Sequence, residues 1–144
     1  MFKVSESAII ERLPAEVFDI AADPYKQLEW DAGTLKRVEK LSPGPLGRGA
    51  RYRGSFKGFG EVEYEFPEYE PGRRFAHHAV MKMGDMRHIF EFEAVPEGTR
   101  LTQSILVEPK GMGKLMAPMM RVMLRKRLRE IATALGHYLR VPSS

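Results

Sequence analysis

Five polar side chains stand out as groups that could do chemistry in this chain: Tyr52, Tyr64, His77, His88 and Gln103. Each falls in an alternating segment whose same-face neighbours are apolar, so each is expected to point into the protein interior. Phenol, imidazole and amide groups can orient a ligand in an apolar pocket, and His77, Tyr64 and His88 are the candidates for a general acid or base. The alternative is that each polar tip pairs with a backbone group, as most buried polar groups do.

Apart from Met1, the methionines form two clusters, one around a predicted turn and one at the start of the last helical segment: Met81, Met83 and Met86, then Met112, Met116, Met119, Met120 and Met123. Because Met is unbranched and polarizable, it adapts to surfaces of varied shape. Two such clusters facing each other would form a deformable wall of a ligand cavity. The alternative is that they fill an irregular core.

Two single residues bear on the same cavity. Trp30 is the only tryptophan, and it either caps the mouth of a pocket or anchors the core. Gly54 falls where a side chain would occupy the cavity, although a glycine there would also ease the curvature of the sheet.

Metal and cofactor chemistry are not expected. The chain has four histidines and no cysteine, and His77 and His78 are adjacent strand positions that point to opposite faces. The glycines of GPLGRGARYRG precede a predicted strand instead of a helix, so they are turn residues and not a phosphate-binding loop.

A basic run, Arg125-Lys126-Arg127 with Arg121 and Arg129, could contact an anionic membrane or RNA. The simpler reading is a solvated helix face. No aromatic residue interleaves with the run, so no nucleic-acid partner is expected.

The length of 144 residues suits one domain spanning residues 1–144, with a net charge of only +4. The N-terminus lacks a signal-peptide pattern and no apolar run reaches membrane-spanning length, so a cytoplasmic protein is expected. The absence of cysteine agrees with a reducing compartment. A monomer and a weak homodimer both remain open.

The segments that must position these residues follow from periodicity and turn signals: a strand at Phe2–Arg12, a helix at Pro14–Ala22, a short helical turn toward Trp30, a strand at Leu35–Leu41, a loop at Ser42–Gly49, five further strands, and a helix at Gly111–Arg140. Pro118 either starts that helix or kinks it.

The pairing register of the first hairpin after this loop can be inferred from its apolar and charged faces. A three-residue loop at Lys57-Gly58-Phe59 pairs Tyr52 with Tyr64 and Arg53 with Glu63, whereas a two-residue turn would mix apolar and charged faces. The next two hairpins are expected to close at Gly84-Asp85 and Glu97-Gly98. Their parity predicts one apolar face formed by Phe75, His77, Ala79, Met81, Met83, Met86, His88, Phe90, Phe92, Leu101, Gln103, Ile105 and Val107.

The last helix shows an apolar stripe at Met112, Met116, Met119, Met123, Leu124, Leu128, Ile131, Leu135 and Leu139. It is the one predicted helix long enough to cover the apolar face of the sheet.

The order of these segments resembles the START-like (SRPBCC) superfamily and its polyketide cyclase/dehydrase family. The resemblance rests on LPAEVFDIAADPYKQLEW, GPLGRGARYRG, YEPGRRF and EGTRLTQSILVEPKG, which together span nearly the whole chain. It implies an α+β helix-grip fold, in which a curved antiparallel sheet of about seven strands wraps around the long C-terminal helix and two short helices follow the first strand. It also implies a central cavity for small apolar molecules, without specifying a reaction.

Three hypotheses follow. The first is binding, with or without transport, of a small hydrophobic ligand such as a lipid or a polyketide-like aromatic. The second is a cyclase, dehydratase or aromatase, in which His77 and Tyr64 would serve an aldol-type cyclisation. The third is peripheral contact with a membrane or ribosome through the basic helix. The expected ligand-binding residues are Trp30, Tyr52, Tyr64, Phe66, Phe75, His77, Met81, His88, Phe90, Phe92, Gln103, Met116, Met119 and Met123.

Overall fold

A computed structural model describes residues 1–140. Its elements in chain order are β1 (Phe2–Ile10), α1 (Pro14–Ala22), α2 (Pro24–Trp30), β2 (Leu35–Lys40), β3 (Arg51–Phe56), β4 (Gly60–Glu70), β5 (Arg74–Met81), β6 (Gly84–Val95), β7 (Gly98–Pro109) and α3 (Gly113–Arg140). The seven strands form one antiparallel sheet in the order β1-β7-β6-β5-β4-β3-β2. The predicted helix-grip architecture is confirmed.

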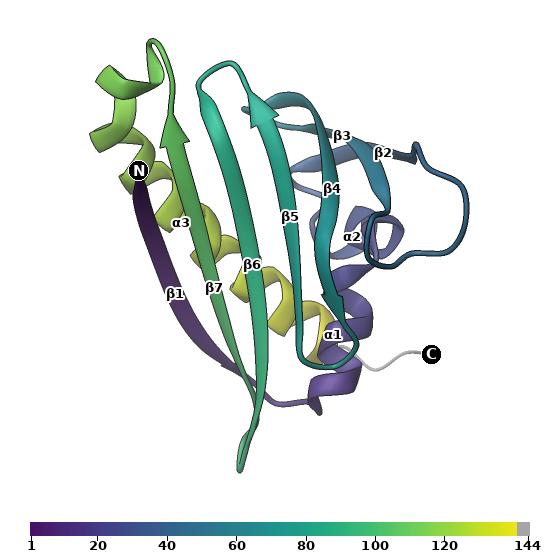
Figure 1. Cartoon of the computed structure of the whole chain (residues 1–144). Helices are drawn as coiled ribbons and strands as arrows, with labels where there is room; N and C mark the ends of the chain where they lie inside the picture. The colour runs from purple at the N-terminus through teal and green to yellow at the C-terminus, as the bar shows by residue number, and fades with distance from the viewer. Residues whose placement is uncertain (141–144) are drawn as a thin grey trace.

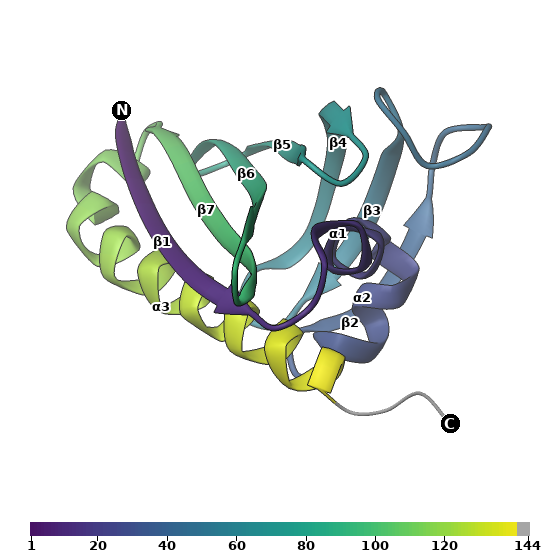
Figure 2. The same cartoon turned by 90° about the horizontal axis from the view of Figure 1, so that it is seen from below.

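The sheet is strongly curved, and all three helices lie on its inner side (Figures 1 and 2). The long helix α3 packs along β1 and β7, while α2 packs on β2 at the other end of the sheet. Prolines at the first positions of α1 and α2 suit the helix start, because a first-turn N–H has no helical partner. The space between α3 and α2, under the central strands, is where the site lies.

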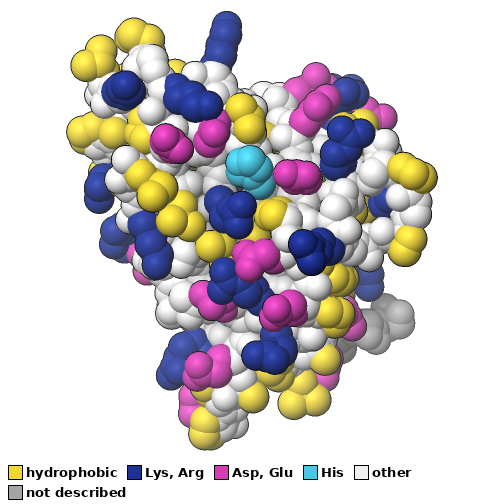
Figure 3. Space-filling view, in the orientation of Figure 1, with side chains coloured by type: hydrophobic (Ala, Val, Ile, Leu, Met, Phe, Trp, Pro, Cys, Tyr) yellow, Lys and Arg dark blue, Asp and Glu magenta, His cyan; other side chains and the backbone are white. Residues whose placement is uncertain are grey.

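The register of the β3–β4 hairpin is as predicted. Tyr52 pairs with Tyr64 and Arg53 with Glu63, and Phe56 pairs with Gly60 across the three-residue loop. Arg53 also makes ion pairs with both neighbouring strands, at 2.7 Å to Glu39 and 2.7 Å to Glu63. Charged side chains of both signs therefore alternate over the outer face of the sheet (Figure 3).

The turn of the β5–β6 hairpin lies two residues earlier than expected, and the turn of the β6–β7 hairpin lies one residue earlier. Met81 pairs with Gly84, so the loop is Lys82-Met83, and Val95 pairs with Gly98. Both glycines serve close approaches between strands: a Cβ would lie 2.5 Å from the Glu108 carbonyl oxygen at Gly84 and 2.5 Å from the Ile10 carbonyl oxygen at Gly98. The register changes by an even number of residues in each hairpin, so the strand residues retain their predicted faces. The prediction is wrong for Met83, which lies in the loop and is 38% exposed.

The predicted stripe of α3 is wrong over its first half. Met112, Met119 and Met123 are 65%, 56% and 45% exposed, whereas Leu124, which the stripe includes, and Met120, which it leaves out, pack against the sheet. The reason is that Met119 and Met123 are each followed directly by an apolar residue, so apolar side chains cover both faces of the segment. Periodicity cannot select between two adjacent stripes of this kind. Pro118 lies inside the helix and does not start it.

Candidate ligand-binding pocket

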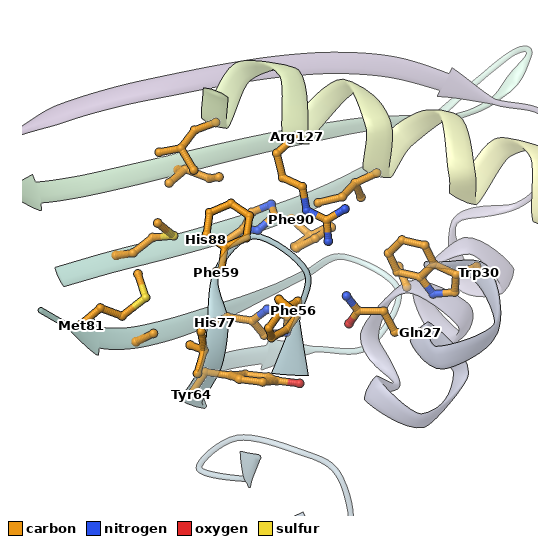
Figure 4. A pocket seen from close by; sticks show the side chains of 17 residues that line it. Gln27, Trp30, Phe56, Phe59, Tyr64, His77, Met81, His88, Phe90 and Arg127 are labelled. Atoms are coloured by element: carbon orange, nitrogen blue, oxygen red, sulfur yellow. The ribbon is translucent and has the colours of Figure 1, made fainter. Parts of the chain in front are cut away.

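A cavity of about 120 Å³ lies between the inner face of the sheet and the three helices. Its walls are mostly apolar, and its polar lining comes from the central strands, α2 and α3 (Figure 4). The residues that line it are Ala21, Gln27, Trp30, Phe56, Phe59, Val62, Tyr64, His77, Ala79, Met81, Met86, His88, Phe90, Ile105, Leu124, Arg127 and Ile131.

Tyr64 and His77 bring unpaired polar atoms to this cavity from neighbouring strands. Their rings lie 4.8 Å apart between centroids. Among the side chains of residues 1–140, Tyr64 Oη and His77 Nε2 are the solvent-inaccessible polar atoms without a hydrogen-bond partner. An unpaired buried hydroxyl or imidazole nitrogen destabilises the protein, by about 1–3 kcal/mol. Tyr64 and His77 are therefore residues of the cavity lining that each keep one polar atom without a hydrogen-bond partner.

His88 is already engaged. Its Nε2 lies 3.1 Å from Gln103 Oε1, and Gln103 Nε2 donates to the Leu128 carbonyl oxygen at 2.9 Å. A carbonyl can only accept, so the Gln103 amide oxygen must face His88, and the hydrogen bond requires His88 to carry its proton on Nε2. This chain of hydrogen bonds ties β6 to β7 and to α3 and holds the His88 ring in place in the cavity wall.

Burial keeps both imidazoles neutral. Desolvation lowers the pKa of His77 to about 3. Desolvation also lowers the pKa of His88 to about 3, with a further contribution from the neighbouring His77. Burial raises the pKa of the Tyr64 phenol above its ordinary value, so the hydroxyl stays protonated. At neutral pH Tyr64, His77 and His88 are thus uncharged, and Arg127, paired with Asp31, is the charged residue of the lining.

A buried ion pair closes the wall between α2 and α3. Arg127 Nη1 and Nη2 lie 3.0 and 2.6 Å from the two carboxylate oxygens of Asp31, the residue that ends α2. Gln27 Nε2 donates to the same carboxylate at 2.9 Å. Figure 4 shows Gln27 and Arg127 pointing into the same region from opposite sides, next to Trp30, whose indole donates to the Ile20 carbonyl at 3.1 Å.

The β3–β4 hairpin supplies two aromatic rings, Phe56 and Phe59, beside His77 and His88 (Figure 4). Phe59 lies on the hairpin loop and is 37% exposed. The Phe56 ring rests over Gly54, where a Cβ would lie only 2.7 Å from Phe56 Cε2. Gly54 therefore makes room for a pocket-lining ring and does not itself border the cavity.

The structure divides the predicted ligand-binding residues into three groups. Those at the cavity are Trp30, Tyr64, His77, Met81, His88 and Phe90. Those buried next to it but not lining it are Tyr52, Phe66, Phe75, Phe92 and Gln103. Those outside the lining on α3 are the exposed Met119 and Met123 and the half-buried Met116, so the expected methionine wall on the helix side is replaced by Leu124, Arg127 and Ile131.

Sequence reasoning missed Gln27, Asp31, Phe56, Phe59 and Arg127. The basic run predicts that Arg127 lies on a solvated or anion-contacting face, yet its side chain is only 13% exposed and pairs with Asp31. The i, i+4 spacing of Gln27 and Asp31 predicts that the two side chains share one helix face. It does not identify Arg127, 96 residues from Asp31 in the chain, as their partner.

Two further features of residues 1–140 bear on function. No three His, Asp or Glu side chains in this range are grouped as a metal site requires. Within the same range, no helix combines the length and hydropathy needed to cross a membrane.

The chain is similar to known proteins over most of its length. The family model described as "polyketide cyclase / dehydrase and lipid transport" matches residues 1–137. Uncharacterized proteins of Mycobacterium bovis and Mycobacterium tuberculosis are 26% identical over 126 residues, which is 82% of this chain and 75% of theirs.

Solved structures share the fold. The di-domain ARO/CYC protein BexL from the BE-7585A biosynthetic pathway superposes with a TM-score of 0.82 at 14% identity, covering 99% of this chain and 51% of BexL. A START superfamily protein from Mycobacterium smegmatis superposes with a TM-score of 0.76 at 18% identity, covering 94% of this chain and 95% of its own.

Proposed function

The chain belongs to the polyketide cyclase/dehydrase and lipid transport family, and on that premise we propose that it binds a small apolar ligand that carries a hydroxyl or carbonyl group. The observation that carries this proposal is the pair of unpaired polar atoms, Tyr64 Oη and His77 Nε2, on two residues of a mostly apolar cavity. A ligand oxygen placed between them would satisfy groups that the protein leaves without a partner.

The size of the cavity limits what enters it. An engineered cavity of about 150 Å³ lined by aliphatic and aromatic side chains binds benzene. The cavity here is about 120 Å³, so it suits a single ring or a branched aliphatic group. Only part of a longer lipid or a multi-ring polyketide would fit inside the cavity. The rest of the molecule would lie at the rim formed by Phe56 and Phe59, where the hairpin loop is exposed.

The walls favour an aromatic body. Phe90 stacks on His88 with ring centroids 4.2 Å apart, and Tyr64 and Phe66 flank His77 at 4.8 and 4.7 Å. Aromatic rings gain from edge-to-face and offset contacts beyond the area they bury. A ring with one oxygen substituent therefore matches both the walls and the polar pair.

A cyclase or dehydratase is the second candidate. The rings of Tyr64 and His77 lie close together, and each keeps a polar atom without a hydrogen-bond partner, as an acid–base pair requires. The pKa values argue for binding instead. An imidazole with a pKa of about 3 is a weak base and is not an acid at neutral pH, and a phenol with a raised pKa is a weak acid. The favoured role of the pair is thus to hold a ligand oxygen by neutral hydrogen bonds.

The test uses phenol and toluene, two probes of nearly equal shape that differ in one hydroxyl. Binding is measured by ligand-observed NMR and by the fluorescence of Trp30, which borders the cavity and is the only tryptophan. We expect phenol to bind roughly fivefold to tenfold more tightly than toluene, as one net hydrogen bond provides.

The Tyr64→Phe variant should lose most of this preference while keeping toluene binding. The matched control is Tyr138→Phe, which removes a surface hydroxyl bonded to Glu29 and leaves the cavity untouched. Equal affinity of the parent protein for the two probes, or no binding of either, would contradict the proposal. Native mass spectrometry of the protein from its own host, before and after solvent extraction, would then identify the natural ligand by its mass.

A further inference from the structure

An exposed apolar stripe runs along the first half of α3, on the side opposite the sheet. Its members are Met112, Leu115, Met119 and Val122, spaced three and four residues apart so that they share one helix face. Leu115 and Val122 are 76% and 73% exposed. Figure 3 shows hydrophobic side chains gathered where the first turns of α3 lie in Figure 1. We call these four residues the α3 apolar stripe.

The β5–β6 loop extends this surface. Met83, 38% exposed, sits on that loop, and its carbonyl accepts from the Lys110 N–H at 3.0 Å. A Cβ on Gly113 would collide with the same carbonyl, so the first turn of α3 approaches the loop closely. The stripe and the loop tip therefore form one end of the molecule.

Within residues 1–140, this end carries cations without acidic partners. Residues 109–129 hold seven Lys and Arg and no Asp or Glu. Four of the seven pair with acidic residues elsewhere, namely Lys110 with Asp85, Lys126 with Glu130, Arg127 with Asp31 and Arg129 with Glu6. Exposed Lys114, Arg121 and Arg125 flank the stripe on one side of the helix, and Arg121 lies over the Phe2 ring at 4.9 Å. Apolar side chains bordered by cations are typical of helices that lie in the headgroup region of a bilayer.

We propose that the α3 apolar stripe and the β5–β6 loop dock on an anionic lipid bilayer. The basic flank supplies the attraction to acidic headgroups, and the stripe enters the boundary between headgroups and acyl chains. A second copy of the chain is a poorer occupant, because it would bring Lys114, Arg121 and Arg125 against the same charges on its own stripe without any acidic partner.

The docking surface is continuous with the cavity through two elements. Met81 of β5 lines the cavity, and Met83, two residues further on, is exposed. Leu124 of α3 lines the cavity, and Met123, directly before it, is exposed. A protein docked in this way holds the β5 and α3 walls of its cavity next to the lipid. The proposal stands on the surface alone and does not depend on what the cavity binds.

The experiment is flotation of the full chain with vesicles of phosphatidylcholine, with and without phosphatidylserine. We expect binding to the anionic vesicles alone, weakened by salt. Leu115→Ser/Val122→Ser and Lys114→Glu/Arg125→Glu should each weaken it roughly tenfold or more. The matched controls are Val80→Ser, an equally exposed apolar residue on β5, and Lys26→Glu/Lys57→Glu, exposed cations elsewhere; both should bind as the parent does.

Three results would overturn the proposal. The first is that the parent floats with neither vesicle, and the second is that both double variants bind as well as the controls. The third is a dimer, measured by light scattering, that Leu115→Ser/Val122→Ser converts to a monomer, because the stripe would then be occupied by a second copy. The charge variants leave the apolar residues intact, so they test docking even if the serine variants unfold.

Discussion

Arg127 on α3 forms a two-pronged ion pair with Asp31 at the end of α2, with N–O distances of 3.0 and 2.6 Å. The two side chains are 13% and 5% exposed, and Gln27 donates a third hydrogen bond to the carboxylate. The pair joins the long helix to the helical segment that carries Trp30. It therefore sets the distance between two walls of the cavity.

Removing one partner of this pair should be strongly destabilising, because the other charge stays buried without compensation. We expect Asp31→Ala to lower the free energy of unfolding by about 3 kcal/mol or more in urea denaturation. The control is Glu63→Ala, which removes an exposed partner of Arg53 and should change stability by less than about 1 kcal/mol. Similar losses in the two variants would mean that the Arg127–Asp31 pair is effectively solvated.

The hydrogen-bond chain from His88 through Gln103 to Leu128 should determine the tautomer of His88. Nitrogen NMR should find the proton of His88 on Nε2, facing Gln103. Gln103→Leu leaves the His88 N–H without a partner and removes the side-chain bond to the Leu128 carbonyl, so we expect a loss of about 2 kcal/mol in unfolding free energy. A proton found on Nδ1 in the parent protein would contradict this assignment.

Acid should destabilise the protein through its buried histidines. An unfolded His77 takes up a proton with a pKa near 6.5, while the folded pKa is about 3, so protonation favours the unfolded chain. The stability is fully present above pH 6.5 and decreases as the pH falls toward 3, by at most about 1.4 kcal/mol per pH unit for each such histidine. Urea denaturation between about pH 7 and pH 4 measures this slope.

The His77→Phe variant separates this effect from the titration of carboxylates. It removes one group that only the unfolded chain protonates, so stability should depend less steeply on pH, while the value at pH 7 stays close to that of the parent. Parallel slopes for the two proteins would show that His77 is protonated in the folded state as readily as in the unfolded chain.

Gly54 and Phe56 should be energetically coupled. A Cβ at position 54 would lie 2.7 Å from the Phe56 ring, so Gly54→Ala should displace the ring from the cavity rim and cost about 1–3 kcal/mol, as overpacking does. In a Phe56→Leu background the same substitution should cost much less. A double-mutant cycle measures the difference, and additive effects would show that the ring yields freely.

Local patterns predicted the sheet well because a strand has a period of two. Alternation placed Tyr64, His77 and His88 on the inner face, and charge pairing selected the three-residue loop between β3 and β4. The two later hairpins show why this worked even where the turn was misplaced. Gly84 and Gly98 are needed for strand contacts instead of turns, yet a register change of even parity leaves the side chains of the strands on their expected faces and misplaces only Met83, which falls in the loop.

Periodicity and turn residues therefore predicted the order of elements, the inner face of the sheet and the family resemblance, because each of these depends on residues that are close in the chain. The tertiary structure alone decided which face of α3 is buried, since Met119-Met120 and Met123-Leu124 place apolar side chains on both faces and only packing against the sheet selects one. It also decided that Arg127 meets Asp31 and that Tyr64 and His77 keep unpaired atoms. Contacts between residues far apart in the chain depend on how helices and sheet pack, and no local pattern encodes them.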